Sequence, residues 1–213
     1  YKNPHHEEQI FGILEQVGFK YISVSSQISA LIKILNRAET TCVNAYLSPV
    51  IHDYINRISG KIGNHGFHVM TSAGGLINAD SFLPKDSLLS GPAGGVVGAA
   101  LIGRKSGYPK LLTFDMGGTS TDVSRYDNGF DYVAELEVGD AHLFTKALAI
   151  ETVAAGGGSV CTLDEDRLTV GPESAGAFPG PSCYGNGGPL AITDIYFFNP
   201  RVGMRATEDG PVN

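Results

Sequence analysis

The sequence predicts an α/β fold, and three observations support that prediction. Apolar residues recur at helical spacing in the first half of the chain, whereas short alternating segments between glycine-rich turns fill the second half. The 213 residues are enough to bury a substantial core without disulfides. Hydrophobic residues make up 42% and charged residues 17%, a balance that excludes a disordered chain.

The chain is expected to begin with a helix. Asn3 is its predicted N-cap, Pro4 takes the first helical position, and Gly18 ends it. The apolar face of this helix contains Ile10, Ile13, Leu14 and Val17. The alternation in residues 19–25 then suits a strand.

A second helix is expected over residues 38–58, with Gly60 as its stop. Pro49 lies inside it and removes one backbone hydrogen bond, so a kink is expected there. Its apolar stripe is expected to contain Val43, Leu47, Val50, Ile51, Tyr54, Ile55 and Ile58. A short strand is expected at residues 67–71.

A stretch of small residues, 93–102, follows Gly91-Pro92. Each glycine disfavours an isolated helix by about 1 kcal/mol relative to alanine, so a helix here requires support from packing. Gly94 and Gly98 would share one face of that helix, and the face would allow another backbone to approach closely.

Strands and turns dominate from residue 109 onward. An antiparallel meander is expected from residues 111–115, 120–126 and 130–138, with turns at Gly117-Gly118 and at Asp127-Asn128-Gly129. After residue 150, glycine and proline turns separate short strands.

Composition excludes several classes of protein. The net charge is −7, so a broad phosphate-binding surface for nucleic acid is not expected. The longest weakly polar run, residues 91–103, is too short to cross a bilayer. The cysteines form no Cys-x-x-Cys pair, which argues against a disulfide framework and a structural zinc site. A cytoplasmic setting is therefore expected, with neither nucleic acid nor membrane as a partner.

The segment that follows the first meander strand combines groups that bind a nucleotide triphosphate. Asp115 would hold hydrated Mg²⁺, and Gly117 and Gly118 would let the backbone approach the β- and γ-phosphates. Hydroxyl groups would come from Thr119, Ser120 and Thr121. The same residues are also compatible with an ordinary hairpin turn that an aspartate caps.

A second candidate loop is the run of Gly156, Gly157 and Gly158 before Ser159. Three flexible residues can expose consecutive N–H groups to an anion. The alternative is a tight crossing close to another backbone. Cys183 has no identifiable histidine partner, which argues against a role as nucleophile.

The order of these features resembles the actin, sugar-kinase and heat-shock chaperone ATPase superfamily, because a helix of small residues from Pro92 comes before the hairpin at Asp115. Neither a Walker GxxxxGK[ST] motif nor a GxGxxG motif after a strand occurs. The resemblance implies an actin-like fold with nucleotide between two ribonuclease-H-like domains. Residues 1–90 would be part of the first, with connecting helices, and residues 91–213 the second, which carries the phosphate-binding hairpin and is truncated.

An ordered set of motifs narrows the resemblance. The set comprises Thr40-Thr41 with Asn44-Ala45-Tyr46-Leu47, Ser72-Ala73-Gly74-Gly75-Leu76, Ser90-Gly91-Pro92-Ala93-Gly94-Gly95-Val96, the Asp115 turn, Thr152-Val153-Ala154-Ala155-Gly156-Gly157-Gly158-Ser159, residues 170–177 and residues 179–185. In this order the motifs resemble the hydantoinase A and 5-oxoprolinase family, and most of all 5-oxoprolinase. The resemblance extends from Pro4 to about Asp194.

The family resemblance implies ATP-dependent hydrolysis of a small cyclic amide, of the 5-oxoproline or hydantoin type, with ATP and Mg²⁺ as cofactors. An amide carbonyl is a poor electrophile, and phosphorylation of its oxygen would let water attack it. Asp115 would position the metal, residues 117–121 would contact phosphate, and Asp122 would support this catalytic aspartate. The same resemblance favours cofactor binding at the triple-glycine run, and a hydantoinase B-type subunit or domain as partner.

Two alternatives stay open: a subunit of an ATP-dependent acetone or acetophenone carboxylase, and a nucleotide-binding fragment without catalysis. The family's first phosphate motif and its adenosine-binding segment do not occur in this sequence, so the chain is expected to be an internal fragment that is inactive alone. Ala149 and Glu151 stand where the family often has Asp and His, so no metal or base role is expected at these positions.

Overall fold

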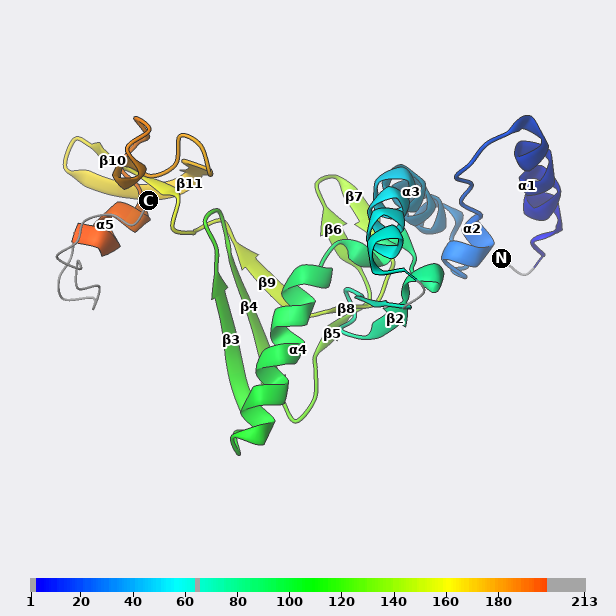
Figure 1. The fold of residues 1–213 in the computed structure, drawn as a ribbon, viewed down its shortest axis with the longest axis horizontal. Coiled ribbons are helices and arrows are strands. Elements are labelled where there is room, and N and C mark those ends of the chain that lie inside the picture. The colour runs from blue at the N-terminus through cyan, green and yellow to red at the C-terminus, as the bar shows by residue number, and fades with distance from the viewer. Residues whose placement is uncertain (1–2, 64–65, 199–213) are drawn as a thin grey trace. The chain divides into compact units, whose positions relative to one another are not determined.

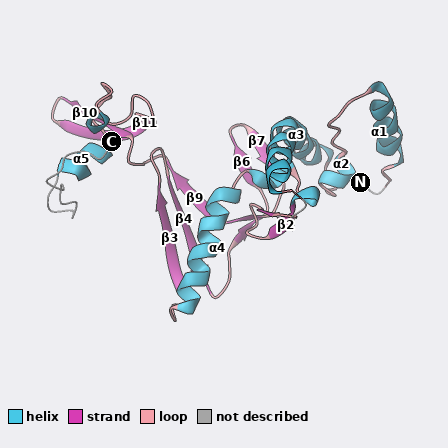
Figure 2. Ribbon diagram, viewed as in Figure 1, coloured by secondary structure: helices cyan, strands magenta, loops and turns pink. Residues whose placement is uncertain are grey.

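The structure is a computed structural model that describes residues 3–63 and 66–198. Helices and strands both contribute to it, which confirms the α/β class (Figures 1 and 2). The chain divides into two compact units. The first unit runs up to Leu111 and resumes from Arg125 to Ala149, and the second joins Leu112–Ser124 to the described chain from Ile150 onward. The division into ribonuclease-H-like domains at residue 90 stays a prediction.

The first unit begins with the helices α1, His5–Val17, α2, Ser25–Ile28, and α3, Ile34–Ile62 (Figure 1). Helix α1 ends where predicted, because Gly18 adopts a left-handed φ of 99°. The strand predicted over residues 19–25 is wrong, since Ser25 already starts α2. Helix α3 is longer than predicted at both ends and passes through Gly60.

The buried face of α3 is mostly polar, unlike the predicted apolar stripe. Val50 and Tyr54 are 69% and 60% exposed. The residues that α3 buries are Arg37, Thr40, Asn44, Ser48 and Ile55. Polar side chains can be buried at low cost only when they are paired, and these are. The Arg37 side chain donates to Ser25 and to the Leu31 carbonyl, at 2.8 and 2.7 Å.

Apolar burial in the first unit centres on the strands that follow α3. Strands β1, His68–Met70, and β2, Leu76–Asn78, pair antiparallel. Short 3-10 helices follow at Ala79–Ser81 and Pro84–Ser87. The core cluster comprises Ile55, Ala79 and Phe82, with Ile51, Phe67, Val69 and Ile77 packed against it.

Helix α4, Ser90–Lys105, confirms the helix predicted from the small-residue stretch. The expected close approach at Gly94 and Gly98 is wrong for the described residues. A Cβ at Gly94 would meet only Met70 at 3.9 Å, and one at Gly98 would meet nothing within 4 Å. The tight position is Gly103, where a Cβ would collide with the Leu111 side chain.

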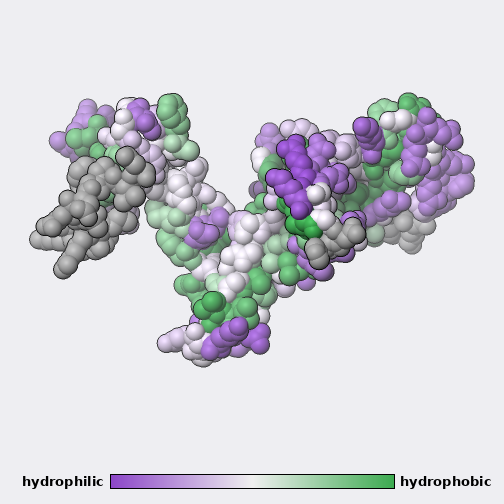
Figure 3. All heavy atoms as spheres, viewed as in Figure 1, coloured by the Kyte–Doolittle hydropathy of each residue, from purple (hydrophilic) through white to green (hydrophobic). Residues whose placement is uncertain are grey.

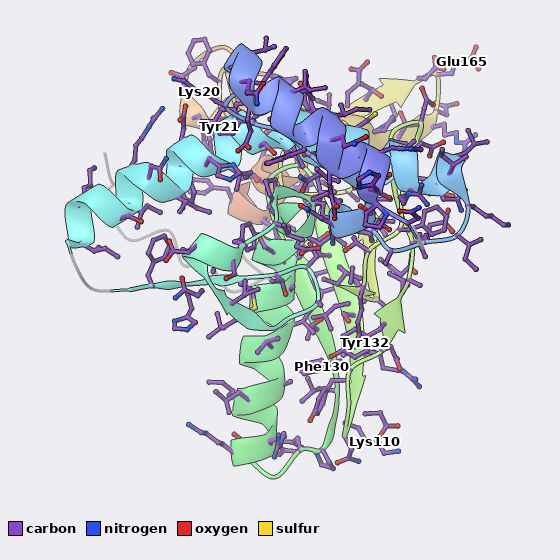
Figure 4. The ribbon with its side chains drawn as sticks, turned by 90° about the vertical axis from the view of Figure 1, so that its right-hand side faces the viewer. Lys20, Tyr21, Lys110, Phe130, Tyr132 and Glu165 are labelled. Atoms are coloured by element: carbon purple, nitrogen blue, oxygen red, sulfur yellow. The ribbon has the colours of Figure 1, made fainter. Side chains whose placement is uncertain are left out.

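The predicted meander is correct for its first two strands and wrong for the third. Strands β3, Lys110–Met116, and β4, Thr121–Asp127, are neighbours, but the third strand of the sheet is β9, Ile150–Val153, antiparallel to β4. Of residues 130–138, Phe130 packs on Tyr126 with ring centroids 5.0 Å apart, and Tyr132 pairs with Leu148. Figure 4 labels Phe130 and Tyr132. Distant partners therefore compete successfully with the local hairpin.

The remaining strands of the first unit form small two-stranded sheets. Strand β5, Tyr132–Val133, pairs with β8, Ala147–Leu148, and β6, Leu136–Val138, pairs with β7, Ala141–Leu143. In the turn before β5, Asn128 has a positive φ of 53°, whereas the φ of Gly129 is not positive.

The second unit holds the hairpin of β10, Ser159–Asp164, and β11, Arg167–Ser174, a 3-10 turn at Ser182–Tyr184, and helix α5, Ile192–Phe198. Strand β3 lies at one end of its sheet order, and its side chains Leu112 and Phe114 are 75% and 71% exposed. Figure 3 shows this hydrophobic surface over β3. None of the helices in residues 3–63 and 66–198 has the length and apolar character needed to span a bilayer.

Candidate functional site

The predicted phosphate turn connects β3 to β4 in the second unit. Gly117 donates its N–H to the Ser120 carbonyl at 2.9 Å, which closes the turn directly after β3. Asp115, near the end of β3, has an exposed side chain. Its carboxylate makes no hydrogen bond to the part of the chain that the structure describes. A free carboxylate therefore stands next to a closed tight turn.

The outer part of the turn carries free donors. The N–H groups of Gly118 and Thr119, and the hydroxyls of Thr119 and Ser120, find no acceptor among residues 3–63 and 66–198. A Cβ placed on Gly118 would meet nothing within 4 Å. Consecutive backbone N–H groups in a turn form a concavity that attracts anions. The turn can thus accept a phosphate group without losing an existing hydrogen bond.

Thr121 and Asp122 use their polar atoms for hydrogen bonds within the protein instead. Thr121 is 5% exposed, and its hydroxyl donates to the Ala155 carbonyl. Asp122 accepts a hydrogen bond of 2.7 Å from Thr152, its partner across the β4–β9 ladder. Both groups tie β4 to the segment that leads into the triple glycine. Phosphate contact by Thr121 and a catalytic role of Asp122 stay predictions.

The triple-glycine run crosses directly beneath the turn. Gly157 donates its N–H to the Gly117 carbonyl at 2.9 Å, and Gly158 donates to the Gly118 carbonyl at 2.6 Å. The Gly156 N–H is also used, because it donates to the Ser159 hydroxyl at 2.9 Å. These amides hold the turn from inside the protein, and cofactor binding by them stays a prediction.

Glycine is required at this crossing for steric reasons. A Cβ on Gly156 would lie 2.7 Å from the Gly117 and Gly118 carbonyl oxygens, and one on Gly158 would lie 2.8 Å from the Gly118 oxygen. Real Cβ atoms essentially never come that close to backbone. The glycine run therefore crosses close to the backbone of the β3–β4 turn, as the alternative to anion binding predicted.

Sequence reasoning missed Asp194, for which the only signal was a weak one, an aspartate near the start of a short helix; this residue organises hydrogen bonds in the second unit. Its side chain is fully buried and accepts hydrogen bonds from the N–H groups of Ser182, Cys183 and Ala191, at 3.1, 2.7 and 2.7 Å. Burial would raise the pKa of Asp194, but hydrogen bonds from the Cys183 thiol and from these N–H groups outweigh burial and lower the pKa. Asp194 is therefore a buried carboxylate that joins a turn to the start of α5.

The contact with Asp194 also affects the thiol of Cys183. Burial and the hydrogen bond to Asp194 raise the pKa of its thiol, in that order of importance. A thiol that stays protonated is a poor nucleophile. This arrangement supports the prediction that Cys183 has no nucleophilic role.

We expect Asp194→Asn to lower the free energy of unfolding by about 2 kcal/mol at pH 7, because an amide is a weaker acceptor and turns an NH₂ group toward backbone donors. The folded-state pKa lies below the unfolded value of about 3.9, so the stabilisation is complete above that pH and is lost as the pH falls through the folded-state pKa. Urea denaturation at several pH values measures this. The exposed Asp164→Asn is the control, and equal losses in both variants would contradict the assignment.

The first unit contains a separate polar cluster around Lys85, which is 8% exposed. Its ammonium group bonds Asp86 at 2.6 Å and Thr145 at 2.9 Å, while its N–H donates to Asn44. Asn44 in turn donates to Ser23 at 3.0 Å. The charge and the amide are fully paired, which indicates a structural network.

A polar cavity of about 300 Å³ lies beside this network. Lys20 and Tyr21, labelled in Figure 4, belong to its lining, and the Tyr21 ring lies 5.2 Å from that of His52 on α3. None of the predicted site residues lines this cavity. The phosphate turn thus remains the candidate site.

The donor set at the turn fits a magnesium nucleotide. In the described part of the chain, no group of three or more His, Cys, Asp or Glu side chains could hold a metal by itself. Mg²⁺ is commonly bound through one or two carboxylates together with substrate phosphates and water. The exposed Asp115 has one carboxylate that fits this requirement, and the free N–H and hydroxyl groups of residues 118–120 fit the needs of phosphate oxygens; metal and phosphate binding by them stay predictions.

The family model and the similar proteins all indicate one family. Residues 37–210 match the family described as Hydantoinase/oxoprolinase. The "5-oxoprolinase PfmaA" of Pestalotiopsis fici is 44% identical over 211 residues, which are 93% of this chain and 16% of that protein. The "Caprolactamase subunit alpha" of Pseudomonas jessenii is 33% identical over 196 residues, covering 88% of this chain and 28% of that subunit.

The fold is also similar to a solved structure, the nucleotide-free acetone carboxylase from a study of ATP-dependent acetone carboxylation. The TM-score is 0.74 with 27% identity, over 94% of this chain and 31% of that one. The chain therefore spans a small part of the length of the proteins it matches.

Proposed function

Since the chain belongs to the hydantoinase/oxoprolinase family, we propose that it takes part in the ATP-dependent hydrolysis of a cyclic amide of the 5-oxoproline or hydantoin type. The observation that carries this proposal is the turn between β3 and β4. It joins a free, exposed carboxylate at Asp115 to free donors at Gly118 and Thr119. That combination suits a phosphate chain with its metal better than it suits a purely structural turn.

The proposed roles follow from the geometry of each residue. Asp115 would hold the Mg²⁺ ion, and the free N–H groups of Gly118 and Thr119 and the hydroxyls of Thr119 and Ser120 would bind phosphate oxygens. Positioning and charge neutralisation supply most of the catalysis in phosphoryl transfer. In the proposed reaction the γ-phosphoryl group of ATP would pass to the ring carbonyl oxygen with release of ADP, and water would then attack the carbonyl carbon so that the C–N bond of the ring breaks. The net reaction consumes ATP and two water molecules and yields ADP, phosphate and the ring-opened product. We also propose the actin-like arrangement of ribonuclease-H-like domains for this nucleotide site.

A second candidate is an ATP-dependent ketone carboxylase subunit, which the similarity to acetone carboxylase favours. Turnover by the complete natural protein separates the two. Release of ADP that depends on 5-oxoproline or a hydantoin supports hydrolysis, whereas release that depends on a ketone with bicarbonate supports carboxylation. No nucleotide turnover with any of these would contradict both.

We further propose a second subunit or domain of the hydantoinase B type as partner. The match to a caprolactamase protein named as a subunit alpha supports this. Co-purification of the complete protein with its genomic neighbours, followed by turnover with and without them, tests the requirement.

We expect Gly118→Ala to fold normally but to bind Mg·ATP at least about tenfold more weakly. The new methyl group meets nothing within 4 Å, so stability should change by less than about 1 kcal/mol. The same methyl would occupy space that a phosphate needs beside the free amides. Calorimetry of the complete natural protein with Mg·ATP measures the affinity, and Gly129→Ala, which also meets nothing within 4 Å, is the control. Unchanged affinity in Gly118→Ala would remove this glycine from the binding site.

A further inference from the structure

The phosphate turn is connected to α5 by a short relay of hydrogen bonds through the triple-glycine run. Thr193, in the first turn of α5, donates both its backbone N–H and its hydroxyl to the Gly157 carbonyl, each at 2.8 Å. The N–H of the same residue, Gly157, donates to the Gly117 carbonyl at 2.9 Å. Only one residue therefore separates Thr193 from the backbone of the turn.

We propose that Thr193 is a positioning residue for the phosphate turn and acts on it through Gly157. The inference rests on the proposed function of the turn and deepens it. Thr193 makes no contact with the nucleotide in this proposal. Its role is to fix the Gly157 peptide, so that the Gly117 and Gly118 carbonyls stay directed inward and the free amides of the turn stay directed outward.

The surroundings of Thr193 make it suitable for this role. The next residue, Asp194, is fully buried and anchors the beginning of α5 through the N–H groups of Ser182, Cys183 and Ala191. The hydrogen bonds of Asp194 therefore also hold the neighbouring Thr193 in place.

Gly157 itself has little freedom to compensate for a lost contact. Its carbonyl accepts both bonds from Thr193, and its neighbours Gly156 and Gly158 are buried against the turn. A glycine run is otherwise the most adaptable stretch of backbone. External bonds are therefore needed to hold it, and the Thr193 hydroxyl supplies one of them. Hydrogen bonds in series polarise one another, so the loss of one weakens the next.

The test is Thr193→Val, which keeps the shape of the side chain and removes only the hydroxyl. In the complete natural protein we expect kcat/KM for Mg·ATP to fall about fivefold to tenfold, the effect of one hydrogen bond, while KM for the cyclic amide stays unchanged. Thr193→Ser should restore the wild-type value. Thr169→Val is the matched control, because it removes a threonine hydroxyl that bonds Thr162 at 2.6 Å in the same unit.

A second measurement keeps this inference separate from the proposed function. Hydrogen exchange of the Gly157 and Gly158 amides should accelerate in Thr193→Val and not in Thr169→Val, with nucleotide absent. Faster exchange in a protein that uses no ATP would support the positioning role and contradict the proposed function. Exchange at the control rate, or a loss of kcat/KM that Thr193→Ser does not restore, would overturn the role of Thr193.

Discussion

Asp115→Asn is expected to lower kcat for ATP hydrolysis roughly a thousandfold, the upper range for removing one preorganised group that stabilises a transition state. Asparagine keeps the size of the side chain but removes the negative charge that would hold Mg²⁺. Folding should be nearly unaffected, because the carboxylate is exposed and bonds nothing in the described chain. Nucleotide turnover in the complete natural protein measures the loss, and urea denaturation verifies the fold.

Asp164→Asn provides the comparison for this substitution. Asp164 is also an exposed aspartate at the end of a strand in the second unit, but it precedes the β10–β11 turn. Its replacement should leave turnover within about twofold of wild type, as surface substitutions usually do. Wild-type turnover in Asp115→Asn would refute metal positioning by that residue.

Gly156→Ala is expected to destabilise the second unit by about 3 kcal/mol, the upper range for forcing an extra methyl into closely packed structure. The added Cβ would lie 2.7 Å from two backbone carbonyl oxygens, those of Gly117 and Gly118. Neither oxygen belongs to a flexible side chain, so the backbone of the turn would have to move. Urea denaturation measures the loss of stability, and Mg·ATP affinity should fall with it.

The comparison within the same crossing is Gly118→Ala, whose Cβ meets nothing within 4 Å. We expect Gly156→Ala to lower stability, because that glycine is needed for folding. We expect Gly118→Ala to weaken only ligand binding, because that glycine is needed for the approach of the ligand. A Gly156→Ala protein as stable as Gly118→Ala would mean that the crossing is looser than the structure has it.

Local signals predicted the elements whose boundaries depend on nearby residues. Gly18 ends α1 because a left-handed residue is needed there, and glycine adopts that conformation without strain. The turn at Gly117-Gly118 was predicted from its glycines and lies where expected. Whether this turn binds phosphate is a matter of function, and its predicted site residues stay predictions.

Distant partners explain the predictions that were wrong. The stripe of α3 was predicted from apolar spacing, but the helix buries Asn44 because Ser23 and Lys85 satisfy its amide. Likewise, Tyr132 pairs with Leu148 instead of continuing a hairpin with β4. Sequence periodicity contains no information on which residue, far along the chain, will meet a given side chain.

Asp194 is a second residue whose role depends on partners that the sequence does not identify. Its three backbone donors come from two stretches of chain, the 3-10 turn at Ser182–Tyr184 and Ala191. An aspartate at the start of a short helix is ordinary, so the sequence offered only a weak signal. The roles of Asp194 and Thr193 become visible only when these stretches are seen together.

Strand β3 ends its sheet in the described chain, and this has a consequence for handling the protein. Leu112 and Phe114 stand largely in solvent on a strand that ends its sheet in the described chain, and such strands template pairing with other chains. Self-association during purification would therefore begin at this strand. The substitution Leu112→Lys would discourage such pairing and leaves the turn at residues 117–120 unchanged.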